Sequence, residues 1–190
     1  RIADGWQVET DQGSLEARHV ILAFSNTERP YWPGWAREAR LVIMVGGEAT
    51  AFERAKPLFE LLGKNIALLG GAGAGQHCKM ANQISVAVGM VAWCEALAYA
   101  QQAGLDPAAV HQSISGGAAG SWALTNLAPR ALSGDYAPGF YVKHILKDMR
   151  IALESAAELK LELAGLATAK ALYDKVAAQG WEDRSEEHTS

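Results

Sequence analysis

The residues whose types and spacing could do chemistry are Lys79 and Asn82, which stand three positions apart directly after the glycine-rich residues 70–75. No proline interrupts residues 76–103 and Gly104 follows them, so this span is predicted to be one helix that begins just before the lysine. Residues three apart share a helix face. The positive end of the helix dipole eases proton release from an ammonium, which suits a lysine that transfers protons. For the motif alone, an exposed lysine beside a capping amide is the plainer alternative.

The glycines before this helix match neither common nucleotide motif. Gly71, Gly73 and Gly75 alternate, whereas a dinucleotide fingerprint has the spacing Gly-x-Gly-x-x-Gly. In a phosphate-binding loop a lysine would follow Gly75, and Gln76 stands there instead. The glycines therefore predict only a turn in which the backbone can approach a neighbour closely.

The elements around this segment divide into two kinds. Strands at 41–45 and 65–69 are predicted to flank a helix at 48–62, which is typical of the end of a parallel α/β unit. From residue 76 onward only helices are predicted. The helix after the long one is predicted at 107–115, with Asp106 as its cap and Pro107 at its first position. The next helix is capped by Ser121, and two more are predicted at 142–160 and 166–179. The fold class is mostly α, with a β-α-β unit and an N-terminal β-hairpin before the helices.

The hairpin is predicted from two β-prone runs, 6–10 and 16–23, around a turn at 11–14. It is similar to a segment of FAD-dependent monooxygenases, although Ala23-Phe24-Ser25 stands where that family has an Ala-Thr-Gly turn. An ordinary exposed hairpin is an equal alternative, and we assign no FAD. At the other end, residues 184–190 resemble a translated sequencing adapter, and we expect them to lie outside the fold.

Composition limits the partners that this chain can have. The 190 residues carry a net charge of -4 and a calculated pI near 5.7, which argues against nucleic acid as the main partner. No uninterrupted apolar run reaches the ~18 residues of a membrane span, so no membrane partner is expected. Cys78 and Cys94 are sixteen residues apart on one predicted helix, ~24 Å at the usual rise, which excludes a disulfide between them. Two free thiols favour a cytoplasmic location. No group of His, Cys and acidic residues has the spacing of a metal site.

Several motifs in order over residues 41–181 resemble the β-hydroxyacid dehydrogenase family, which includes 3-hydroxyisobutyrate dehydrogenase and tartronate semialdehyde reductase. The matching segments are Ile43-Met44-Val45-Gly46-Gly47, Gly71-Ala72-Gly73-Ala74-Gly75-Gln76, Lys79-Met80-Ala81-Asn82-Gln83, Glu95-Ala96-Leu97, Ala103-Gly104-Leu105-Asp106, Gly116-Gly117-Ala118-Ala119-Gly120-Ser121, Pro138-Gly139-Phe140 and Lys147-Asp148. The helical part then corresponds to a C-terminal domain like that of 6-phosphogluconate dehydrogenase.

The resemblance implies a role for each of these positions. Lys79 would be the catalytic lysine. Substrate would be held by Asn82, Gln83, Gly116, Gly117 and Ser121, and the nicotinamide cofactor, NAD or NADP, by Lys147, Phe140 and Asp148. For Gly116 and Gly117 a plain interhelical loop is an equal alternative, and His77 and His144 are expected to be ordinary polar positions.

The resemblance also implies reversible hydride transfer between a β-hydroxyacid and its semialdehyde. A homo-oligomer is expected because a nucleotide-binding remnant with few strands leaves sheet edges and a helical face exposed. The family's nucleotide fingerprint is not found in this sequence. Its Ser-Gly-Gly substrate loop is expected just before the strand that begins near Ile43, and residues 34–40 stand there instead. The chain is therefore expected to be a fragment that is inactive alone. The expected parts are a foreign hairpin segment (1–40), the tail of the nucleotide-binding domain (41–75), the helical dehydrogenase domain (76–183) and the adapter-like tail (184–190). The alternative function is a non-catalytic helical oligomerisation module.

Overall fold

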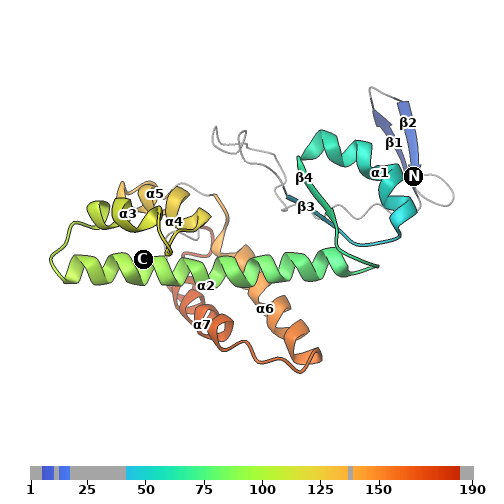
Figure 1. Cartoon of the computed structure of the whole chain (residues 1–190). Helices are drawn as coiled ribbons and strands as arrows, with labels where there is room; N and C mark the ends of the chain where they lie inside the picture. The colour runs from blue at the N-terminus through green and yellow to red at the C-terminus, as the bar shows by residue number, and fades with distance from the viewer. Residues whose placement is uncertain (1–5, 11–12, 18–41, 137–138, 185–190) are drawn as a thin grey trace. The chain divides into compact units, whose positions relative to one another are not determined.

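The computed structural model describes residues 6–10, 13–17, 42–136 and 139–184 (Figure 1). The chain forms two compact units, residues 1–76 and 77–190. Each is considered by itself. Most described residues are helical, and the strands are confined to the first unit, as the sequence predicts.

The first unit contains the predicted hairpin. Strand β1 (Trp6–Thr10) pairs antiparallel with β2 (Gly13–Ala17), with Val8 opposite Leu15. The second strand was expected at 16–23, and residues 18–23 lie outside the described part of the chain. Gly13 and Ser14, expected in the turn, already pair with β1.

The β-α-β unit is confirmed. Strand β3 (Val42–Val45) leads into helix α1 (Ala49–Leu62), and strand β4 (Asn65–Leu68) returns parallel to β3. The pairing continues beyond the strands, because the Leu69 amide donates to the Val45 carbonyl at 2.8 Å and the Gly47 amide donates to Gly70 at 2.9 Å. The glycine-rich turns therefore begin at the carboxyl ends of two paired parallel strands.

Two glycines let the start of the next helix approach this sheet. A Cβ on Gly75 would lie 2.5 Å from the carbonyl oxygen of Met44, and a Cβ on Gly46 would lie 2.7 Å from the carbonyl oxygen of Gly71. Both neighbours are backbone atoms, which cannot swing aside as a side chain would. Close contact therefore explains the glycine at 75, and a φ of +90° explains the glycine at 73, without any phosphate.

Helix α2 (Ala74–Gln102) is the continuous helix predicted, but it begins two residues earlier. Lys79 is consequently the sixth residue of α2 and lies in the second turn. Because the helix-dipole effect fades within the first turn, the expected help from the dipole is lost, and the side chains around Lys79 decide its electrostatics. Among the described residues, α2 is also the one helix long and apolar enough to span a membrane. Core helices of soluble proteins meet the same criterion, and 39% of its apolar window is buried inside the structure.

The remaining helices belong to the second unit. Helix α3 (Pro107–Ser115) is capped by Asp106, whose carboxylate accepts from the Ala108 amide at 3.1 Å. The single helix expected after Ser121 is two, α4 (Trp122–Asn126) and α5 (Ala128–Leu132). Pro129 is the cause, because it has no N–H to donate and its ring would clash with the carbonyl four residues earlier. Helices α6 (Val142–Glu158) and α7 (Ala164–Ala178) match their expected positions within two residues.

One apolar core holds this second unit together. Figure 1 shows α2 as a long rod, with α3, α4 and α5 on one side of it and α6 and α7 on the other. Trp93, Leu124, Met149 and Tyr173 are among the side chains buried in a single cluster that joins these helices. The core therefore sets the register between α2 and α6, which is the packing on which the candidate site depends. Cys78 and Cys94 form no disulfide with each other, as expected.

Candidate active site on helices α2 and α6

Three polar side chains of α2 form the first part of the site. The Lys79 ammonium donates to Oε1 of Gln83 at 2.9 Å, one helical turn away. The Nδ2 group of Asn82 donates to the same oxygen, also at 2.9 Å. The Gln83 side chain is buried, with 4% of the residue exposed, whereas Asn82 is exposed. Lys79 and Asn82 are thus gathered on one buried amide oxygen.

Helix α6 supplies the second part. Nε2 of Gln83 donates to Oδ2 of Asp148 at 2.8 Å, across 65 residues of sequence. The other carboxylate oxygen of Asp148, Oδ1, lies 2.9 Å from the Lys147 ammonium. The Lys147 side chain is 57% exposed and that of Asp148 is 6% exposed. An exposed cation is therefore anchored on a buried carboxylate, which is connected through Gln83 to Lys79.

Burial makes this network obligatory. An ionised carboxylate buried without partners costs several kcal/mol, so its hydrogen bonds must be kept. Asp148 has one from Gln83 and an ion pair with Lys147. The pair at Lys147 alone would contribute little because that ammonium is well exposed.

Phe140 lies seven residues before Lys147, just ahead of α6, with His144 between them in the sequence. The His144 ring meets Phe140 edge-on at 5.7 Å and Tyr141 at 5.4 Å between ring centroids. Burial first, and then the charges of Lys143 and Lys147, lower the pKa of His144 from its usual value of 6.5. A neutral imidazole is therefore favoured beside Phe140.

The residues expected on the loop before α4 have local roles. The Ser121 hydroxyl accepts from the Leu124 amide at 3.0 Å and caps α4 as predicted. Gly116 and Gly117 are exposed in a tight connection, in which the Gly117 carbonyl accepts from the Gly120 amide at 2.9 Å. The substrate role expected for Ser121, Gly116 and Gly117 stays a proposal.

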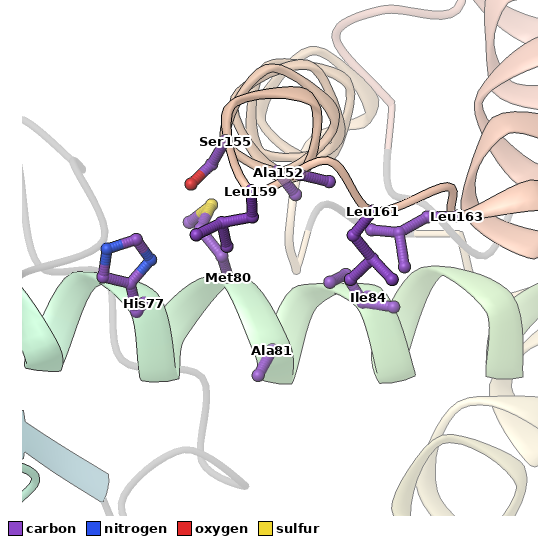
Figure 2. A pocket seen from close by; sticks show the side chains of 10 residues that line it. His77, Met80, Ala81, Ile84, Ala152, Ser155, Leu159, Leu161 and Leu163 are labelled. Atoms are coloured by element: carbon purple, nitrogen blue, oxygen red, sulfur yellow. The ribbon is translucent and has the colours of Figure 1, made fainter.

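A pocket of about 340 Å³ opens on another face of α2 (Figure 2). Its lining comes from α2, from the end of α6 and from the segment between α6 and α7, and is apolar except for His77 and Ser155. None of the expected site residues lines it. A carboxylate substrate would find no cation in its lining, so this pocket is a poor candidate for the active site.

The sequence did not indicate the contact between Gln83 and Asp148. Helical spacing places Lys79, Asn82 and Gln83 on one helix, but it carries no information on which residue of α6 lies opposite. No group of three or more His, Cys, Asp or Glu that could hold a metal occurs among the described residues.

Comparisons with known proteins show the family of this chain. Over 148 residues the chain is 58% identical to the uncharacterised oxidoreductase YkwC of Bacillus subtilis, covering 78% of this chain and 51% of that protein. It is 50% identical over 145 residues to 2-hydroxy-3-oxopropionate reductase of Escherichia coli, covering 76% and 50%. The chain thus spans about half the length of the curated relatives it matches. The 3-hydroxyisobutyrate dehydrogenase of Mycobacterium tuberculosis, solved with L-serine, superposes with a TM-score of 0.74 at 28% identity, covering 81% of this chain and 55% of that one.

Two family descriptions match in succession. Residues 34–71 match the NAD-binding domain of 6-phosphogluconate dehydrogenase. Residues 73–189, more than half of the chain, match the NAD-binding region of NADP-dependent 3-hydroxyisobutyrate dehydrogenase. The second match contains Lys79, Gln83 and Asp148, the residues that the structure joins. This chain belongs to the β-hydroxyacid dehydrogenase family.

Proposed function

We propose that the protein containing this chain is an NAD- or NADP-dependent dehydrogenase that interconverts a β-hydroxyacid and its semialdehyde. Residues 1–76 would include the end of its nucleotide-binding domain, and the helices from 77 onward would form its dehydrogenase domain. The observation that carries the proposal is the Lys79 ammonium, fixed by a buried amide in a chain of this family. A lysine held by a neutral acceptor is suited to give up and regain a proton.

Lys79 is the acid and base of this reaction. In the reducing direction its ammonium donates a proton to the carbonyl oxygen, which becomes the hydroxyl of the product. In the oxidising direction the neutral amine takes that proton back. The cofactor, when bound, supplies or accepts the hydride.

Asn82 is positioned to hold the substrate next to Lys79. One of its amide hydrogens is directed to Gln83, and the side chain is exposed, so its carbonyl oxygen and second hydrogen are available to a ligand. Gly116, Gly117 and Ser121 would receive the substrate carboxylate on backbone amides and a hydroxyl.

Two places in the chain suit an anionic dinucleotide. The Lys147 ammonium is exposed and pairs with the buried Asp148 carboxylate, and Phe140 offers an apolar ring seven residues earlier in the chain. In the first unit, the carboxyl ends of β3 and β4 run into glycine turns, which is where open parallel sheets bind nucleotides. Lys147, Phe140 and Asp148 would hold the cofactor. Two cysteines that form no disulfide favour a cytoplasmic protein. The two-stranded β3–β4 sheet leaves edges that favour a homo-oligomer.

The test needs the whole enzyme. We define the full-length chimera as this chain joined to the part of the Escherichia coli 2-hydroxy-3-oxopropionate reductase that it does not match. Oxidation of NADH and NADPH is followed with a panel of semialdehydes, and the reverse reaction with β-hydroxyacids. We expect turnover with at least one pair, and a loss of ~100- to 10,000-fold in kcat in Lys79→Ala. A folded chimera that binds cofactor but reduces no semialdehyde would contradict the proposal and favour a non-catalytic helical module.

A further inference from the structure

Gln83 has no exposed surface with which to hold a substrate. Only 4% of the residue is exposed, and its amide is engaged at both ends. Its oxygen has two lone pairs, and these face the two donors Lys79 and Asn82. Its nitrogen donates to Asp148. The amide therefore works within the protein, and substrate contact is left to Asn82.

Asp148 determines which end of the Gln83 amide faces Lys79. If the amide were turned over, its NH₂ group would meet the donors of Lys79 and Asn82, and its oxygen would meet a carboxylate oxygen. Both contacts would be repulsive. Since an ionised carboxylate only accepts hydrogen bonds, Asp148 holds Nε2 toward itself and Oε1 toward Lys79.

The amide also bonds two charged side chains, Lys79 at its oxygen and Asp148 at its nitrogen. A carboxylate in direct contact with Lys79 would stabilise the ammonium and oppose release of its proton. The neutral oxygen of Gln83 fixes the ammonium with much less of that effect. The Gln83 amide thus links Asp148 to Lys79 by one hydrogen bond at each of its ends.

We propose that Gln83 is a positioning residue for Lys79, oriented by Asp148, and that it does not bind the substrate. The inference rests on the proposed function, since it assigns a role within the same site. Lys147 is the exposed member of the network. An anion that binds Lys147 would therefore change the ion pair of Asp148, the carboxylate that orients Gln83. Within four residues of Lys79 or Asp148 along α2 and α6, the other titratable or charged side chains are His77, Cys78, His144, Lys147 and Arg150.

The test uses pH–rate profiles of the full-length chimera in the oxidising direction, where the acidic limb reports proton loss from the base. Gln83→Leu removes the acceptor from the ammonium, so the limb should move to lower pH, and kcat should fall ~100-fold as the lysine loses its fixed place. Gln83→Glu puts a negative charge beside the ammonium, so the limb should move to higher pH. The Michaelis constant for the cofactor should change less than twofold in both. The matched control is Gln101→Leu, an exposed glutamine of the same helix, which should leave both profiles unchanged.

Two substitutions of Asp148 distinguish a loss of Gln83 orientation from a loss of folding. Asp148→Asn keeps an acceptor for Gln83 and loses the charge that anchors Lys147, so it should raise the cofactor Michaelis constant and lower kcat less than Asp148→Leu does. In the double variant Gln83→Leu/Asp148→Leu, the fold-loss in kcat should be smaller than the product of the fold-losses in the two single variants, because both residues act through the same hydrogen bond.

The outcomes distinguish this inference from the function beneath it. If the chimera is active and needs Lys79, yet Gln83→Leu and Gln83→Glu keep the wild-type kcat and acidic limb, the positioning role is wrong and the dehydrogenase stands. If Gln83→Leu does not fold, the test is the shift of the acidic limb to higher pH in Gln83→Glu. If that shift is absent, the positioning role of Gln83 is wrong. A raised Michaelis constant for the hydroxyacid with normal kcat would show that Gln83 binds substrate directly. An inactive chimera rejects both proposals.

Discussion

Gly75→Ala and Gly89→Ala make the same chemical change in one helix and should have opposite effects on stability. Both glycines are in α2, and neither has a positive φ. A Cβ at Gly75 would lie 2.5 Å from the Met44 carbonyl oxygen and 3.0 Å from the Gly46 amide nitrogen. A Cβ at Gly89 would meet nothing within 4 Å. The pair therefore separates helix propensity from the close approach of the helix to the sheet.

The magnitudes follow from two competing terms. Alanine in place of glycine stabilises a helix by up to ~1 kcal/mol, and this gain should appear almost undiminished at Gly89. At Gly75 the added methyl group displaces backbone, and overpacking of this kind costs about 1–3 kcal/mol. We expect a net loss of about 1–2 kcal/mol for Gly75→Ala and a gain of about 0.5–1 kcal/mol for Gly89→Ala.

Urea unfolding followed by far-ultraviolet circular dichroism measures both changes. Hydrogen exchange shows where Gly75→Ala acts. The Gly47 amide donates to Gly70 and the Leu69 amide donates to Val45, and both amides should exchange faster in Gly75→Ala only. Equal stabilisation by both substitutions would refute the close approach between α2 and β3.

Three further predictions concern the proposed site. Ser121→Ala should lose about 1 kcal/mol of unfolding free energy as a lost helix cap and should also raise the substrate Michaelis constant; Asp106→Ala, a cap outside the proposed site, should lose a similar amount of stability with no kinetic effect. Lys147→Ala should raise the cofactor Michaelis constant more than it lowers kcat, and the opposite pattern in steady-state kinetics would argue against its role. Because the pKa of His144 is lowered in the folded state, chiefly by burial, the protein should lose stability as pH falls from 6.5 through that lower value, and His144→Gln should lack this part of the loss in urea titrations across that range.

Local sequence patterns predicted most of the helices and strands. The β-α-β unit and the 29-residue helix α2 follow from apolar periodicity, and the caps at Asp106 and Ser121 follow from side chains that bond the next turn. The start of α2 was missed because Ala74 and Gly75 carry no start signal, and the close packing that glycine permits at Gly75 is tertiary. The break at Leu127 was missed although Pro129 signals it, because the apolar spacing of Leu124, Leu127 and Leu132 continues across the proline.

The site was predicted residue by residue, but its connections were not. Lys79, Asn82 and Gln83 were assigned separate contacts with a substrate, and Lys147 and Asp148 with a cofactor. The packing of α6 on α2 places Gln83 against Asp148 and turns these assignments into one network. Such a contact depends on the register of two helices across the core, which is set by side chains far from the site. The pocket beside His77 was also unexpected, since its apolar lining is indistinguishable in sequence from core.

The most direct test of the central claim is the single-turnover rate of NADH or NADPH oxidation by the full-length chimera with its best semialdehyde, compared with Lys79→Ala. The account predicts a loss of ~100- to 10,000-fold in this rate at unchanged cofactor affinity. It also predicts partial recovery when a small primary amine is added, because the amine can donate the missing proton. A Lys79→Ala variant that turns over at a near-normal rate without added amine would contradict the assignment of Lys79 as proton donor.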